Sequence, residues 1–479
     1  MNNKTYDLIV IGGGSGGLVC AAGGAGLGAK VALIEKKKLG GDCLNTGCVP
    51  SKALIRSATV IHTLQKAKTY GIKECHFQFE FSDIMNRVKV IQKTLEPHDS
   101  PERFRSLGID VKFGNYTFKS SHELTNGEET LYGKRIVIAT GSSPFVPPIP
   151  GCEEKKCLTS DSIWNLSSLP KRLAVIGGGP IGSEMAQAFA RFGSQVTVID
   201  MAPSILPRED SDLKAFVQKA FVEDGIQFRF NAQLKKVTHG PSSHTVTFEY
   251  QGKEETLECD GIFVSVGRKP NGGGLELEKV GIATHKGGIV INPYCQTTLS
   301  HVYACGDVAG PYQFTHFADY QARLILRNAL FPGKAKADYR VVPWCTYTDP
   351  ELARVGLSQT EAQQKNIPHD VFTYDLSDLD RAVCDGEGRG MVKVLTQKGK
   401  DKILGAAIVG FHAGDLLQEF VFAMKHNLGL KSISQTIHPY PTMSEATRRV
   451  SDLWMKGKLT PTFSKLLKWY FKNLFNRWA

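Results

Sequence analysis

A strand, a glycine-rich turn, a helix and a second strand follow one another near the start of this chain, and this order constrains the fold more than any other feature. The apolar run 5–11 precedes a G-x-G-x-x-G arrangement, and a second strand at 30–34 ends in Glu35. The three glycines are Gly12, Gly14 and Gly17. The pattern predicts a βαβ unit in which the glycines allow a tight turn close to a pyrophosphate, the helix N-terminus binds phosphate, and the acid binds ribose hydroxyls.

The same pattern recurs at residues 172–200, which end in Asp200. Its glycines are Gly177, Gly179 and Gly182. An α/β protein with two separate dinucleotide sites is therefore expected. Asp200 would bond a free ribose 2′-hydroxyl, and no Arg follows it before Arg208, so NADH is favoured over NADPH. The alternative is that both units have only a structural role and bind no nucleotide. This alternative fits poorly with two complete copies of the motif that flank a pair of cysteines.

That pair, Cys43 and Cys48, lies in the sequence GGDCLNTGCVPSK at 40–52. Two cysteines on one short bend can close a disulfide when their Cα atoms lie within about 7 Å of each other. Pro50 predicts a helix that begins near Cys48, where the helix dipole favours a thiolate, and Lys52 adds positive charge. We therefore expect a redox-active dithiol rather than two buried structural thiols.

A second pair with the same spacing, Cys152 and Cys157, provides an internal comparison. Its sequence GCEEKKC is polar and charged, with no double glycine before it and no apolar helix after it. We interpret this pair as a loop with free thiols. Context, and not spacing, distinguishes the two pairs.

Length and composition limit the class of protein. A chain of 479 residues is too long for one core and predicts about three or four domains. The apolar content of 42% is ordinary for a soluble protein, and neither a signal peptide nor a transmembrane span is expected. Eleven cysteines without a framework pattern argue against a secreted disulfide scaffold and favour the cytoplasm. The net charge is +11, but six Lys or Arg and no acid follow Asp452, so more than half of the excess lies in the tail and nucleic-acid binding is not expected.

Two similar strand-to-turn segments, 136–144 and 263–271, contain Gly141 and Gly267 at their turns. Such segments suit crossings between two nucleotide-binding domains, which implies that the first domain is interrupted. A third segment, 298–307, ends in Asp307, whose carboxylate could reach a cofactor hydroxyl.

With these motifs the chain resembles the class I pyridine nucleotide–disulfide oxidoreductases, which include dihydrolipoamide dehydrogenase, glutathione reductase and mercuric reductase, from residue 6 to about 452. The resemblance implies an α/β fold with two Rossmann-like FAD/NAD(P)-binding domains and an α+β dimerisation domain at the C-terminus of a homodimer. The expected limits are 1–150 for the FAD-binding domain, 151–270 for the NAD-binding domain, 271–342 for a central domain that completes the FAD site, 343–455 for the dimerisation domain and 456–479 for a basic tail.

The family pattern also implies roles for single residues. Electrons would pass from NADH through FAD to a Cys43–Cys48 disulfide and on to a small-molecule or metal-ion acceptor. Cys48 would be the sulfur next to the flavin and Cys43 the sulfur that meets the substrate. Lys52 would pair with Glu184 beside the flavin ring, and Asp307 would bind the ribityl chain of FAD.

One departure from the family concerns a base near the C-terminus. Dihydrolipoamide and glutathione reductases carry a His five residues before a Glu, whereas this chain has Tyr440 before Glu445. A phenol of pKa about 10 cannot replace an imidazole as a base at neutral pH, so ordinary dithiol exchange is expected to be impaired. A Tyr at this place is similar to mercuric reductase, but the terminal Cys pair of that enzyme is absent, and the last cysteine here is Cys384. His438 is a candidate substitute base, with a solvated or capping His as the simpler interpretation.

The tail at 460–479 has apolar residues at helical spacing, with lysines on the other face. The apolar residues are Phe463, Leu466, Leu467, Tyr470, Phe471, Leu474, Phe475 and Trp478. A basic helix of this kind favours a membrane surface or a membrane-protein partner, for example on the inner face of the membrane, while packing on its own domain or the second subunit stays open. A second hypothesis for the whole chain is therefore a membrane-associated electron-transfer or redox-sensing flavoprotein.

Overall fold

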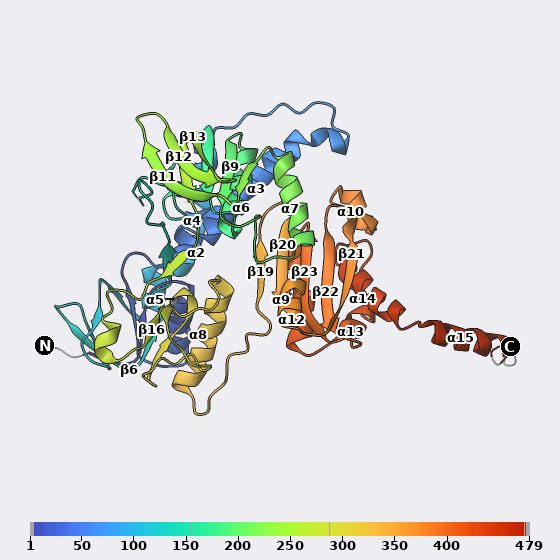
Figure 1. The fold of residues 1–479 in the computed structure, drawn as a ribbon. Helices are drawn as coiled ribbons and strands as arrows, with labels where there is room; N and C mark the ends of the chain where they lie inside the picture. The colour runs from blue at the N-terminus through green and yellow to red at the C-terminus, as the bar shows by residue number, and fades with distance from the viewer. Residues whose placement is uncertain (1–3, 154, 287, 474, 476–479) are drawn as a thin grey trace. The chain divides into compact units, whose positions relative to one another are not determined.

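The computed structural model describes residues 4–473 apart from 154 and 287, together with residue 475 (Figure 1). The chain forms two compact units. The first comprises Met1–Ile205 and Asp224–Asp338, and the second comprises Leu206–Glu223 and Tyr339–Ala479.

The first unit begins with the expected βαβ arrangement, which we call the first module. Strand β1 (Lys4–Ile11) pairs in parallel with β2 (Val31–Glu35) and with β6 (Thr130–Ile138), and its apolar side chains are buried. Between β1 and β2 runs α1 (Ser15–Gly26), whose small residues allow close packing, because a Cβ on Gly24 would lie only 2.9 Å from Leu8. The sheet order is β3-β2-β1-β6-β5-β4, with β18 beside β6. Its other strands are β3 (Asp110–Phe113), β4 (Thr117–Phe118), β5 (Glu123–Thr125) and β18 (Val302–Ala304).

A second module in the same unit repeats the arrangement. Its parallel sheet has the order β10-β9-β8-β14, and α6 (Pro180–Arg191) joins β8 to β9. An antiparallel sheet packs its apolar side chains into the same core. The strands of the two sheets are β8 (Arg172–Ile176), β9 (Gln195–Asp200), β10 (Gln227–Phe230), β14 (Gly261–Val264), β11 (Gln233–His239), β12 (His244–Tyr250) and β13 (Lys253–Cys259).

The two predicted crossings lie side by side as an antiparallel pair, β7 (Ser142–Pro144) and β15 (Arg268–Pro270). Each follows a glycine with positive φ, +68° at Gly141 and +136° at Gly267. The turns bond each other, since Phe145 N donates to Gly267 O at 2.9 Å and Asn271 N donates to Gly141 O at 2.9 Å. The backbone of the first module therefore leaves and returns at one place.

The second unit is built on a five-stranded antiparallel sheet of order β19-β20-β23-β22-β21. Helix α7 (Ser211–Glu223) belongs to this unit although its sequence lies between β9 and β10, and Figure 1 draws it in green beside the orange sheet. The buried Lys393 ties α7 to the sheet, because its Nζ lies 2.8 Å from Asp212 Oδ2 and 3.1 Å from Asp210 Oδ2. The other elements include β19 (Pro343–Thr346), β20 (Glu351–Gly356), β21 (His369–Asp375), β22 (Met391–Gln397), β23 (Ile403–Gly410), α10 (Asp380–Asp385), α12 (Gln418–Lys425), α14 (Glu445–Gly457) and α15 (Pro461–Asn473).

The expected fold class is confirmed: two α/β modules with parallel sheets of the predicted Rossmann-like type and a C-terminal unit of sheet and helices. The residue limits of the individual domains stay predictions. Part of the predicted tail, residues 474 and 476–479, lies outside the described residues.

Candidate active site

The first and last glycines of each motif have the same geometry in both modules. Gly12 and Gly177 adopt φ of +107° and +102°, and a Cβ there would lie 2.3 Å from Ala139 O and 2.7 Å from Ser265 O. A Cβ on Gly17 would lie 1.8 Å from Gly12 O, and one on Gly182 would lie 1.9 Å from Gly177 O. Because no side chain fits at these positions, only glycine allows each turn and its helix to pack against the strands.

The acids at the ends of the second strands hold these loops. Glu35 Oε2 accepts a hydrogen bond from Gly13 N at 2.6 Å, and Asp200 Oδ2 accepts one from Gly178 N at 2.5 Å. Each carboxylate thus fixes its glycine loop and lies where a nucleotide ribose is expected to bind.

The helix N-termini beyond the loops suit a pyrophosphate. Gly14 and Gly179 are the N-cap residues of α1 and α6, and no described side chain caps either helix or places an acid in its first turn. The first backbone N–H groups of both helices therefore have no capping side chain, and their dipoles favour an anion. The backbone N–H donors at these two helix N-termini suit the pyrophosphate of a dinucleotide in each module.

The predicted dithiol segment packs directly on the first glycine loop. Gly40 N donates to Gly13 O at 2.9 Å, and a Cβ on Gly41, which has φ of +54°, would lie 2.6 Å from Gly14 Cα. Cys43 lies in the short helix α2 (Gly41–Asn45), and Cys48 is the first residue of α3 (Cys48–Gln65), as its sequence predicts. The dithiol is thus positioned by the same backbone that would hold a nucleotide.

The two thiols differ in acidity. A hydrogen bond with Cys43 is the largest cause that lowers the pKa of Cys48, to about 6, and the same bond raises the pKa of Cys43 above its usual range. Thr315, the first residue of α8 (Thr315–Leu330), adds to this effect because its Oγ1 lies 3.5 Å from Cys48 Sγ. Cys48 is therefore the thiolate of the pair at neutral pH.

Lys52 and Glu184 meet as the family pattern implies. Lys52 Nζ lies 2.8 Å from Glu184 Oε2, and the carboxylate is buried on α6 of the second module. Lys52 stands one helical turn after Cys48 and lowers the pKa of that thiol by its charge.

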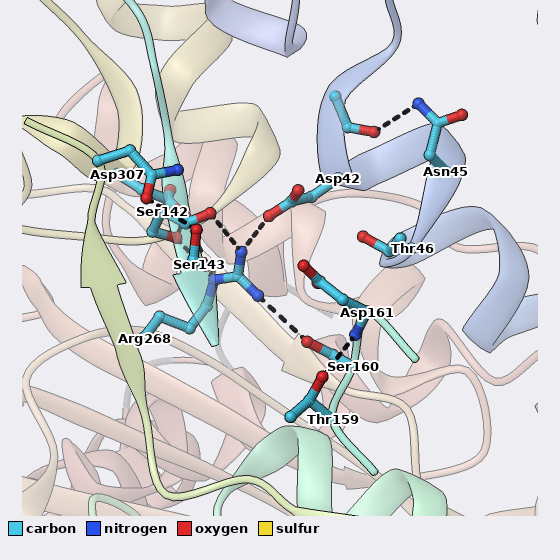
Figure 2. Close-up of polar contacts among 12 residues, drawn as sticks. Asp42, Asn45, Thr46, Ser142, Ser143, Thr159, Ser160, Asp161, Arg268 and Asp307 are labelled. Atoms are coloured by element: carbon cyan, nitrogen blue, oxygen red, sulfur yellow. Dashed lines mark hydrogen bonds and ion pairs between the residues drawn. The ribbon is translucent and has the colours of Figure 1, made fainter. Parts of the chain in front are cut away.

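Arg268 joins several segments around the site, as Figure 2 shows. Its Nε lies 2.6 Å from Ser142 Oγ, one terminal nitrogen lies 3.4 Å from Ser160 Oγ, and the other forms an ion pair with Asp42, next to Cys43. Asp307 accepts a hydrogen bond from Ser142 Oγ at 2.5 Å, and burial raises the pKa of Asp307. Arg268 Nε also lies 3.7 Å from Asp307 Oδ2, so Arg268 connects Asp307 to Asp42 of the dithiol segment.

Arg268 and Thr315 belong to the site although no sequence motif singles them out. Arg268 directly follows Gly267, and Thr315 begins the helix after Asp307. Each reaches the dithiol segment from more than 200 positions along the chain. For Arg268 the only indication in the sequence is its place in the strand-to-turn segment 263–271, and no sequence motif indicates Thr315.

Tyr440 and Glu445 lie in the second unit. The Tyr440 side chain is 67% exposed, and its hydroxyl donates to Asp380 Oδ2 at 3.0 Å, which raises the pKa of the phenol. Glu445 is the first residue of α14 and is buried, with Arg448 at 3.0 Å. The raised pKa leaves even less tyrosinate at neutral pH than an ordinary tyrosine provides, so Tyr440 is not available as a base.

His438 does not share that exposed position. Its side chain is buried, with Nε2 3.0 Å from Glu419 Oε1 and Nδ1 3.0 Å from Thr436 O. Both ring nitrogens face oxygen acceptors, so His438 is a buried, hydrogen-bonded histidine and not the solvated one of the simpler interpretation.

Comparison with known proteins identifies the class to which this fold and site belong. The family model of pyridine nucleotide-disulphide oxidoreductases matches residues 6–322, and the dimerisation domain of the same family matches residues 342–451. The chain therefore belongs to the pyridine nucleotide–disulfide oxidoreductases.

Several relatives cover nearly the whole chain. A dihydrolipoyl dehydrogenase of Bacillus subtilis is 35% identical over 455 residues, which span 92% of this chain and 96% of that protein. A mercuric reductase of Lysinibacillus sphaericus is 32% identical over 460 residues, 95% of this chain and 84% of that one. Among solved structures, a Cu(II) complex of the HOCl-induced flavoprotein disulfide reductase RclA from Escherichia coli matches with a TM-score of 0.83 and 28% identity, over 95% of this chain and 100% of that chain.

The protein is accordingly an FAD-dependent oxidoreductase that uses a pyridine nucleotide and a redox-active disulfide, and its dimerisation domain supports a homodimer. The relatives favour this enzyme class over an electron-transfer or sensor flavoprotein. Among the described residues, no helix has both the length and the apolar character needed to cross a bilayer.

Proposed function

We propose that this enzyme is an NADH-dependent reductase whose Cys43–Cys48 dithiol serves a thiophilic metal ion, Cu(II) or Hg(II), in preference to dihydrolipoamide. The observation that carries the proposal is Tyr440, which stands where disulfide-exchanging relatives carry a histidine base and whose hydroxyl is bonded to Asp380. Because His438 is buried with both nitrogens engaged, it offers no replacement base. The relatives include mercuric reductase and a Cu(II) complex of RclA as well as dihydrolipoyl dehydrogenase, so their names are compatible with a metal-ion acceptor but do not select it.

The dithiol chemistry needs no base when the acceptor is a metal ion. Thiolates are soft ligands that bind copper and mercury strongly, and the lowered pKa of Cys48 provides one thiolate at neutral pH. Two thiolates that each give one electron to a Cu(II) ion form one disulfide and two Cu(I) ions, so electrons balance. Metal binding displaces the proton of Cys43, whose pKa is raised first by the hydrogen bond to Cys48 and then by burial.

The residues around the dithiol have distinct roles in this proposal. Bound FAD supplies the two-electron relay between the nucleotide and the disulfide. Cys48 is the thiolate nearest the cofactor, and Cys43, on the neighbouring helix α2, meets the acceptor. Lys52, fixed by Glu184, stabilises negative charge next to Cys48.

We also propose NADH over NADPH for the second module. Asp200 is anchored by Gly178 N and by Ala202 N at 2.7 Å, so its carboxylate is held at the end of β9. A carboxylate fixed there accepts a ribose 2′-hydroxyl and repels a 2′-phosphate.

A further proposal concerns α15, which we expect to bind an anionic membrane surface from the cytoplasmic side. None of its described residues is buried, and Phe463, Leu466 and Phe471 are 45%, 55% and 51% exposed. Lys465 and Lys468 lie on the same helix, and no acid follows Asp452. This combination of exposed aromatic residues and cations is typical of helices that lie at a lipid interface. The predicted contributions of Leu474 and Trp478 fall outside the described residues.

The acceptor proposal is tested by steady-state oxidation of NADH with Cu(II), Hg(II) and glutathione disulfide as acceptors, and by reduction of NAD+ with dihydrolipoamide as the donor. We expect turnover with a metal ion and weak dihydrolipoamide activity that rises about 100-fold or more in Tyr440→His, because a general base contributes about that much. Tyr374→His is the matched control, since the Tyr374 hydroxyl is also hydrogen-bonded within the second unit, to Asp378 O at 2.9 Å. Faster turnover of dihydrolipoamide than of metal ions by the natural protein would refute the argument from Tyr440.

A further inference from the structure

Cys152 and Cys157 are free thiols in the segment between β7 and β8, as the sequence predicts, but they are buried and adjacent. Their side chains are 4% and 3% exposed, and their sulfurs lie 3.9 Å apart. A disulfide bond is about 2.05 Å long, so the two sulfurs need to approach by only about 2 Å.

The backbone on both sides of this pair is fixed in the second module. Pro150 O accepts a hydrogen bond from Val237 N at 2.8 Å, and a Cβ on Gly151 would lie 1.9 Å from Val237 O. After the pair, Leu158 N donates to Ile262 O at 2.8 Å. Since both ends are held by strands of the core, the sulfurs stay within reach of each other without a large movement of the chain.

The two thiols of this pair also differ in acidity. The hydrogen bond between the two sulfurs lowers the pKa of Cys157 and raises that of Cys152, as the equivalent bond does for Cys48 and Cys43. A thiolate attacks hydrogen peroxide to give a sulfenic acid and hydroxide, and a neighbouring thiol then displaces water to give a disulfide. The two thiols lose two electrons, and the peroxide takes them up.

We propose that Cys152 and Cys157 form a second disulfide in this protein when it meets a two-electron oxidant such as hydrogen peroxide, independently of the Cys43–Cys48 pair. The surroundings of this pair differ from those of Cys43 and Cys48. It lies within an apolar cluster of the second module that includes Val237 and Cys259.

The sequence makes the product easy to detect. Trypsin cleaves after Lys155 and Lys156, so this disulfide joins two peptides, 136–155 and 157–171, with the loss of two hydrogens. Cys43 and Cys48 lie in one peptide, 39–52, which serves as the internal control for oxidation in the same digest.

The experiment uses the full-length, FAD-loaded enzyme, treated with hydrogen peroxide, alkylated under denaturing conditions and digested without reductant. We expect the linked peptides in the natural protein and in Cys43→Ser, and their disappearance after treatment with dithiothreitol. In Cys152→Ser, or Cys152→Ala if the serine variant folds poorly, Cys157 should be recovered as a sulfenic acid trapped by dimedone.

Two results would overturn the proposal. One is recovery of Cys152 and Cys157 as separately alkylated peptides at a peroxide dose that fully oxidises the 39–52 peptide. The other is a link from Cys157 to Cys259 in place of Cys152.

Discussion

Thr315 offers a direct test of how the protein sets the acidity of Cys48. The change Thr315→Val keeps the shape of the side chain and removes the hydroxyl that lies 3.5 Å from Cys48 Sγ. A hydrogen bond to a charged group contributes about 1.5–3 kcal/mol, and one pKa unit corresponds to about 1.36 kcal/mol. Since Thr315 is one of several groups that lower this pKa, the lower limit applies, and the pKa of Cys48 should rise from about 6 to about 7.

The direction of the effect gives a clear signal in absorbance. A thiol with a pKa near 6 is about 90% thiolate at pH 7, whereas one with a pKa near 7 is about half thiolate. The assay is a pH titration of the charge-transfer band between thiolate and flavin in the two-electron-reduced holoenzyme. The band should be lost as the pH falls through the pKa of Cys48, and in Thr315→Val this loss should occur about one pH unit higher.

Two variants control for the change in side chain. Thr315→Ser keeps a hydroxyl and should titrate like the natural protein. Thr63→Val makes the same substitution near the other end of α3, where the hydroxyl bonds only Thr59 O among the described contacts. An unchanged midpoint in Thr315→Val would show that the 3.5 Å contact does not stabilise the thiolate, and that the other groups around Cys48 are sufficient.

Three further predictions follow from the site and the tail. Cys48→Ser should abolish the charge-transfer band, whereas Cys43→Ser should keep it and lose turnover; equal loss in both variants would reverse the assignment of roles. The ratio of kcat/KM values should favour NADH over NADPH, and Asp200→Ala should reduce this preference; an NADPH preference in the natural protein would contradict it. Deletion of residues 460–479 should abolish co-sedimentation with anionic vesicles, with each lysine contributing about 1 kcal/mol at low salt, and leave flavin content and Tm unchanged. A lower Tm with vesicle binding retained would make α15 a packing element.

The glycine loops could be predicted from the sequence because their geometry is local. A Cβ on Gly17 or Gly182 would meet the carbonyl of Gly12 or Gly177, only five positions earlier, so this demand for glycine acts within one strand–turn–helix unit. The start of α3 at Cys48 is equally local, since the proline and the apolar residues that follow it specify a helix. Local elements of this kind can be predicted from the spacing of residue types in the sequence alone.

Contacts that depend on the path of the whole chain could not be predicted. Arg268 reaches Asp42 because two crossings pair as β7 and β15, and nothing near Asp42 in the sequence indicates an arginine partner. Helix α7 lies between two strands of the second module in the sequence, β9 and β10, yet it belongs to the other unit, where Asp212 forms an ion pair with the buried Lys393. In both cases the decisive neighbour lies more than 150 positions away.

The two cysteine pairs show what distinguishes a catalytic dithiol from a pair that is only close. Both have the same spacing, both are hydrogen-bonded, and in both the second cysteine is the more acidic. Only Cys48 begins a long helix, has Lys52 one turn later, and follows a backbone segment that touches the first glycine loop. Cys157 sits instead in a loop within an apolar cluster, with a strand on each side and no helix dipole. Because the sulfurs are close in both pairs, either pair can form a disulfide. Only the surroundings of Cys48 give access to a bound nucleotide. We therefore expect an oxidant, and not the cofactor, to accept the electrons of Cys152 and Cys157.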